Sequence, residues 1–125
     1  MKPNPELPKL DLPKEAPITQ PVEKEVLGPD AESVALAWRF PGVSDKDFEI
    51  LQVVSQVLYN GKAGLIDLDL NQQQKVLNSY GYPMGLADYS ALLLGGLPKQ
   101  GQTLEEVKDL LLSDCLLYTS PSPRD

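Results

Sequence analysis

The chain has 125 residues, of which 42% are apolar and 23% charged, a composition that suits one small globular domain and a length too short for two. Its net charge of −7, with no cluster of Lys and Arg, argues against nucleic-acid binding. Histidine is absent and Cys115 is the only cysteine, which excludes the commonest zinc ligand, a cysteine metal cluster and an internal disulfide. No continuous apolar stretch follows Met1, so we expect no signal peptide and no membrane segment.

Residues 1–30 contain seven of the twelve prolines, mixed with Lys, Glu and Asp. Proline interrupts helices and central strands, so this segment is predicted to be an extended inter-domain lead-in, in which residues 22–26 could form a short strand. Residues 31–114 are predicted to form the first part of a folded domain.

Apolar residues alternate with small or polar ones over residues 33–40, which predicts a strand whose buried face carries Val34, Leu36, Trp38 and Phe40. A helix is expected after Ser44, the predicted cap, with a buried stripe of Phe48, Leu51, Val54 or Ser55, and Leu58. Ile50, Val53 and Val57 widen that stripe, so the helix is expected to be largely buried. Asn60-Gly61 is its predicted end.

Residues 64–77 fit either a strand or a helix. Residues 76–82 and 88–97 are predicted strands, joined by a turn at residues 83–85. Thr103 and Glu106 form a capping box before a helix that buries Val107, Leu110 and Leu111. The predicted fold class is α+β, a partial two-layer sandwich of an antiparallel-type sheet and helices in which the first strand faces the first helix.

Two motifs resemble ligand sites but lack essential residues. Asp67, Asp69 and Asn71 have the spacing of the first EF-hand ligands, but Gln72 and Asn78 stand where the turn glycine and the bidentate glutamate are needed. A solvated helix face is the better interpretation.

Residues 96–103 resemble a phosphate-binding loop, but Gln102 replaces the lysine and Pro98 removes an amide, which favours a plain strand-to-helix turn. Lys62 is interpreted as a surface lysine. The four tyrosines at positions 59, 80, 82 and 89 are interpreted as half-buried residues without the basic neighbours of a nucleic-acid platform. The sequence therefore assigns no catalytic, cofactor-binding or metal-binding residue.

The last eleven residues, 115–125, differ abruptly in character from the amphipathic pattern before them. They fit, codon by codon, a translation of the transposon-end adapter DNA used in short-read library preparation. We therefore expect this tail to be an artefact that packs against nothing, apart from an extra helical turn through Leu116 and Leu117. The native residue at position 114 is then either Asp or Glu, and the chain is expected to be a piece of a longer protein. A native disordered tail rich in Ser and Pro is the alternative.

Several segments, in their order and spacing, resemble the opening of a non-catalytic domain of the insulinase/pitrilysin family of zinc peptidases. They are residues 33–42 (SVALAWRFPG), 51–58, 60–65 (NGKAGL), 89–97 and 103–107. The family usually has serines where this chain has Lys62, Ala63 and Gly64, and its second helix starts with a leucine, here Leu65. The resemblance thus favours a helix for residues 64–77. It also implies the family's metallohydrolase fold, shared with mitochondrial processing peptidase, in which tandem α+β domains enclose a chamber.

The resemblance implies that the parent is a zinc metalloendopeptidase and that this part lines the chamber and helps to hold an unfolded peptide. Its partners would be the remaining domains of the parent. Zinc would be bound elsewhere, by an H-x-x-E-H helix that we expect to be encoded upstream of Met1, so the chain alone should neither bind zinc nor cleave peptides. A periplasmic or other extracytoplasmic parent is suspected. An inactive structural or partner subunit of the family and a free acidic interaction module are the alternatives.

Overall fold

The computed structural model describes Pro8 and residues 11–117. Residues 11–30 run as an extended, exposed segment without helix or strand, as the spacing of their prolines predicts. We call residues 11–30 the lead-in. The short strand considered for residues 22–26 is not formed.

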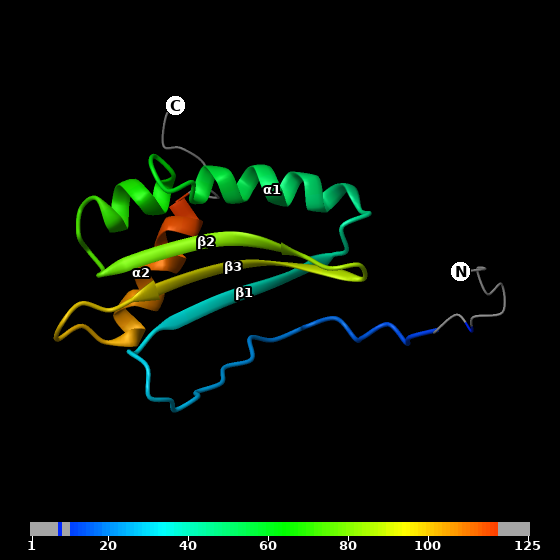
Figure 1. The fold of residues 1–125 in the computed structure, drawn as a ribbon, viewed down its shortest axis with the longest axis horizontal. Coiled ribbons are helices and arrows are strands. Elements are labelled where there is room, and N and C mark those ends of the chain that lie inside the picture. Colours follow the sequence, from blue (N-terminus) through cyan, green and yellow to red (C-terminus); the bar gives the residue numbers. More distant parts are fainter. Residues whose placement is uncertain (1–7, 9–10, 118–125) are drawn as a thin grey trace, which may run out of the picture.

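Six elements follow the lead-in, in the predicted order of strand, helix, short helix, strand, strand and helix. They are β1 (Val34–Pro41), α1 (Lys46–Leu58), the π-helical turn η1 (Asp67–Asn71), β2 (Asn78–Gly85), β3 (Tyr89–Leu97) and α2 (Leu104–Leu117). The strands form one antiparallel sheet in the order β1-β3-β2, so that β3 is central (Figure 1). The fold is mixed, with an antiparallel sheet and helices, which is compatible with the predicted α+β class.

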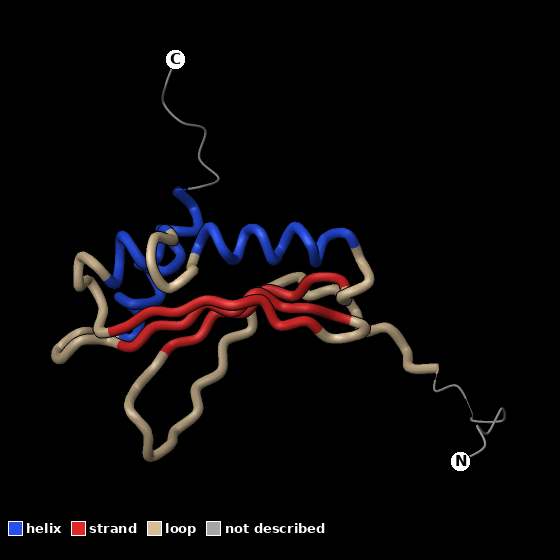
Figure 2. Tube along the Cα trace, turned by 45° about the horizontal axis from the view of Figure 1, so that its top comes forward, coloured by secondary structure: helices blue, strands red, loops and turns tan. Residues whose placement is uncertain are grey.

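The helices lie on one face of the sheet (Figure 2). On β3, the side chains of Leu92 and Leu94 are buried on this face, and a side chain at Gly96 would collide with Val107 of α2. A shared core joins the two layers, and its buried apolar members are Leu51, Leu58, Ile66, Leu70, Val76, Leu92, Leu94, Val107 and Leu111. Side chains alternate along a strand, so every second residue of β1 points away from this core, to the other face of the sheet.

The predicted register of β1 is confirmed. Val34, Leu36, Trp38 and Phe40 are half-buried and pack against the same core as Leu51, Leu58 and Phe48 of α1. Ala35 and Ala37, in contrast, are exposed. The strand thus has one apolar face toward the helices, as its alternation requires.

Helix α1 differs from the expectation in its cap and in its burial. Its N-cap is Asp45, whose side chain accepts a hydrogen bond from the Asp47 amide, so the prediction of Ser44 is one residue early. Leu51, Ser55 and Leu58 are buried. The expectation of a largely buried helix is wrong, since four aliphatic residues on its outer side are exposed by 38–65%: Ile50, Val53, Val54 and Val57. One sheet covers only one side of a helix.

The segment after α1 is helical only over residues 65–71, so the helix that the family resemblance favours for residues 64–77 is shorter than expected and gives way to a turn over residues 72–77. Gly61 adopts a positive φ of 78° in the turn, and the helical residues begin at Leu65. The Gln72 amide donates to the Asp67 carbonyl and the Lys75 amide to the Leu70 carbonyl, five residues back in each case. These bonds make the element a π-helical turn, which is a rare form of helix.

The hairpin turn lies later in the chain than predicted. Residues 83–85 belong to β2, and the connection to β3 is made by residues 86–88, where the Leu86 amide donates to the Tyr89 carbonyl. Pro83 is tolerated because β2 is an edge strand, where a missing N–H breaks no ladder bond on the outer side. The prediction that residues 83–85 form the turn was therefore wrong.

The capping box of α2 is confirmed. The Glu106 amide donates to Thr103 Oγ1 at 3.2 Å and the Thr103 amide to a Glu106 carboxylate oxygen at 2.9 Å. Val107 and Leu111 are fully buried, with Leu110 packed beside them. The helix continues to Leu117, as the expected extra turn requires, but Cys115 packs against the core, so the expectation that it contacts nothing is wrong. The remainder of the tail lies outside the described residues.

Candidate functional site

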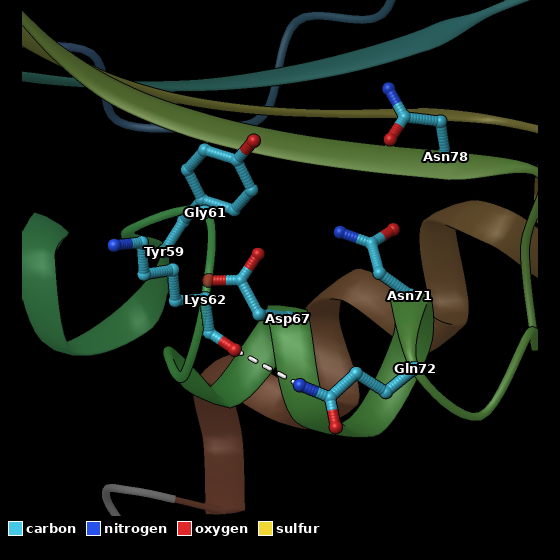
Figure 3. A pocket seen from close by; sticks show the side chains of 7 residues that line it. All are labelled: Tyr59, Gly61, Lys62, Asp67, Asn71, Gln72 and Asn78. Atoms are coloured by element: carbon cyan, nitrogen blue, oxygen red, sulfur yellow. Dashed lines mark hydrogen bonds between the residues drawn. The ribbon is translucent and has the colours of Figure 1, made fainter.

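A polar cavity of about 310 Å³ lies between the turn after α1, the η1 segment and the start of β2 (Figure 3). Its lining residues are Tyr59, Gly61, Lys62, Asp67, Asn71, Gln72 and Asn78. The volume is at the lower end of the range of small-molecule sites, but the lining has a single aromatic residue and few apolar groups to bind a ligand.

The polar side chains of this cavity hold the local backbone. Asp67 is only 4% exposed, and its Oδ2 accepts hydrogen bonds from the amides of Asn60 and Gly64, at 3.0 and 3.1 Å. Gln72 Nε2 donates to the Lys62 carbonyl at 2.9 Å, the bond drawn in Figure 3. Buried carboxylates that accept amide bonds in this way stabilise turns. The cavity is therefore a by-product of how this turn is held.

The residues with calcium-ligand spacing are not brought together as ligands. Asp69 accepts a bond from Gln73, and Asn71 is bonded to Ser79, while Asp67 holds the turn. The interpretation of this stretch as a solvated helix face is wrong for Asp67, which is buried. Across Pro8 and residues 11–117, no group of three or more acidic or cysteine side chains is close enough to hold a metal ion.

The phosphate-loop resemblance resolves into a strand-to-helix turn. Gly96 lies within β3, and Thr103 caps α2. Between them, Lys99 Nζ donates to the Gln74 carbonyl and Gln102 Nε2 to the Lys75 carbonyl, so these side chains hold the neighbouring loop. Lys62 is exposed, as predicted. Burial raises the pKa of the Cys115 thiol, so this thiol is a poorer nucleophile than an ordinary cysteine.

The face of the sheet away from the helices carries a group of tyrosines that sequence reasoning did not assemble. Tyr80 lies over Gly95 and stacks on Tyr82, with ring centroids 6.3 Å apart. Arg39 lies over the ring of Tyr89 at 4.9 Å, so one tyrosine does have a basic neighbour. We call this surface the open face, and it consists of Ala35, Ala37, Arg39, Tyr80, Tyr82, Met84, Tyr89, Ala91 and Leu93.

The lead-in is tied to one end of the open face. Arg39 forms an ion pair with Glu15 at 2.9 Å and donates to the Ala16 carbonyl, while the Glu15 amide donates to the Tyr89 hydroxyl. Most of the open face, including Tyr82 and Met84, stays accessible, at 47% and 41% exposure. The open face could have been identified in the sequence from the alternation of Tyr80, Tyr82 and Met84.

Asp114 of α2 is an unusual group because its side chain is buried without a full set of partners. It is 5% exposed, and its Oδ2 has no hydrogen-bond partner among the described residues. Burial, and then the negative charge of Asp69, raise the pKa of this carboxyl to about 6, against the opposing effect of Lys75. Ionisation of Asp114 therefore works against folding.

We expect Asp114→Asn to stabilise the chain at neutral pH. Because the pKa is raised in the folded state, the stability gained from the neutral carboxyl is present below pH 4 and is lost as the pH rises through about 6. The difference in unfolding free energy between the variant and the parent should grow from near zero at pH 4 to about 2 kcal/mol at pH 7. Urea unfolding across this range measures it, and a pH-independent difference would contradict it.

The chain matches no known family model, and no curated protein or solved structure proved significantly similar to it. Within the described residues, no helix is both long and apolar enough to span a membrane.

Proposed function

We propose that this chain is the chamber-lining, peptide-holding part of a zinc-dependent endopeptidase of the insulinase/pitrilysin family, inactive alone. The observation that supports it best is the open face, a largely accessible sheet surface rich in tyrosine and aliphatic side chains. Its one charged strand residue, Arg39, is paired with Glu15 of the lead-in. Such a surface suits an unfolded peptide of varied sequence, because aromatic rings pack against many side chains and their hydroxyls remain able to hydrogen bond.

The order of elements also supports the family part of the proposal. A strand, a long helix, a small-residue turn and a second helix opening at Leu65 follow the arrangement that the resemblance implies. The family's metallohydrolase fold, the zinc held by another domain of the parent and the contact with the parent's remaining domains all belong to this proposal. Sequencing the DNA that flanks the gene tests them, since an upstream frame without H-x-x-E-H would contradict an active parent.

Binding of a labelled unfolded peptide tests the peptide-holding role directly. We expect a fluorescent peptide of mixed apolar and basic sequence to bind the chain, measured by anisotropy. Tyr82→Ala should weaken binding about 2- to 10-fold, the worth of one aromatic packing partner. Tyr82 is suitable because it is 47% exposed and its removal leaves the core intact.

Val53→Ala is the matched control. Val53 is an exposed apolar residue on the outer side of α1, on the opposite side of the molecule from the open face, and its loss should leave peptide affinity unchanged. Equal effects of the two substitutions, or no binding by the parent chain, would contradict the proposal.

A further inference from the structure

Strand β1 is an edge strand, and no strand of the described residues pairs with its outer side. It pairs only with β3, residue for residue from Val34 to Pro41 and without a bulge. In the part of the chain that the structure describes, no backbone hydrogen bond other than those to β3 involves this strand. Seven residues before Pro41 include no proline, glycine or lysine, the residues that usually discourage edge pairing. Such an edge is a template for another strand.

The other edge of the sheet is blocked. Asn71 Oδ1 accepts from the Ser79 amide at 2.8 Å, and Asn71 Nδ2 donates to the Ser79 carbonyl at 3.0 Å, so one side chain occupies both backbone groups of a β2 residue. Pro83 removes a further donor from β2, and Gly81 and Gly85 weaken it as a template. Strand addition is thus directed to β1.

From this asymmetry we infer that β1 pairs with β1 of a second copy of this chain. An antiparallel pairing that places Ala37 opposite Ala37 of the copy leaves Pro41 outside the ladder. It also puts the apolar faces of the two strands on the same side of the joined sheet. Leu36 then lies opposite Trp38, and Val34 opposite Phe40, all toward the helix layers. Arg39, the only charged residue of the strand, lies opposite Ala35 of the copy, so no like charges meet.

The resulting dimer has a two-fold axis perpendicular to the sheet at Ala37. It contains one continuous six-stranded sheet, with both helix layers on the same side, and the same surface on each copy forms the contact. The half-buried side chains of Leu36 and Trp38 gain apolar neighbours from the copy. One edge strand is a small interface, under about 1,200 Å², so the association is expected to be weak and to require high concentration.

The lead-in passes on the outer side of β1 (Figure 1) but is a poor competitor for the edge. Prolines 13, 17 and 21 have no amide hydrogen. The hydrogen bonds and ion pairs that hold the described part of the lead-in, with Arg39, Tyr89 and Lys108, lie at the surface. A second copy therefore displaces a few exposed bonds. Because each copy carries a charge of −7, added salt should favour the dimer.

A charge swap at Ala37 tests the inference, which does not depend on the proposed function. Ala37 is exposed, so lysine or glutamate there leaves the core unchanged. We expect the parent chain to rise from 13.7 kDa toward twice that mass with concentration in sedimentation equilibrium, and the emission of Trp38, the single tryptophan, to shift to the blue. Ala37→Lys and Ala37→Glu should each weaken association at least about 10-fold, because like charges then face one another, and an equimolar mixture should restore it.

Asn78→Lys and Asn78→Glu, on the exposed start of β2, are the matched controls and should dimerise like the parent. Ala35→Glu gives an independent test, since it places a carboxylate opposite Arg39 of the copy and should tighten the dimer. A parent mass that stays at 13.7 kDa overturns the inference, including the case where an added extended peptide shifts Trp38 emission without a dimer. The inference is also overturned if the Ala37 variants dimerise as strongly as the parent chain, or if the equimolar mixture of the two variants stays monomeric.

Discussion

Gly42→Ala is expected to destabilise the folded chain by about 3 kcal/mol, the upper part of the usual range for forcing a methyl group into a closely packed position. Gly42 is buried where the end of β1 meets the turn between β2 and β3. A β-carbon there would collide with the backbone carbonyl of Ala87 and come within 3.0 Å of the Asp88 carbonyl carbon. Backbone atoms cannot rotate away as a side chain can, so the strand end and the hairpin must separate.

Gly28→Ala is the matched control, because the same methyl group at Gly28 in the lead-in would meet no atom within 4 Å. Its effect on stability should stay within about 0.5 kcal/mol, chiefly through the unfolded chain. Urea unfolding followed by Trp38 fluorescence compares the two variants. A Gly42→Ala midpoint equal to that of Gly28→Ala would show that the hairpin turn yields without cost.

The order and type of the elements could be predicted because their signals are local. The alternation around Trp38 fixed which face of β1 is buried, and the pairing of Thr103 with Glu106 fixed where α2 begins. Both depend on residues at most a few positions apart, with the core following from their periodicity. The boundaries of β2 were missed because Pro83 suggests a turn, and only the position of β2 at the sheet edge makes proline acceptable there.

The candidate surfaces could not be predicted because they depend on which elements become neighbours. Val53 and Val57 look like core residues in the sequence, yet one three-stranded sheet leaves their side of α1 exposed. Tyr80 and Tyr89 are nine residues apart, and their common open face follows only from the register of β2 and β3. The bonds of Asn71 to Ser79 likewise require the tertiary fold.

Asp67→Ala is expected to destabilise the chain by about 3 kcal/mol. The substitution removes the acceptor of two amide groups, those of Asn60 and Gly64, and leaves the buried Gly64 amide without that partner. Asp67→Asn keeps one acceptor oxygen and should cost about half as much, because its bonds are no longer charge-assisted.

Asp69→Ala is the control that separates this structural role from calcium coordination. Asp69 is only half-buried, and its one described hydrogen bond, from Gln73, is long at 3.3 Å, so its loss should cost less than about 1 kcal/mol. Thermal unfolding of the parent and the two alanine variants, with and without calcium, distinguishes the two roles. If Asp67 serves only the turn, calcium leaves all three melting temperatures unchanged, and Asp67→Ala alone is strongly destabilised. A calcium-dependent rise in the parent that both alanine substitutions abolish would instead assign these aspartates to a cation, against the geometry in which Asp67 binds the backbone of residues 60 and 64.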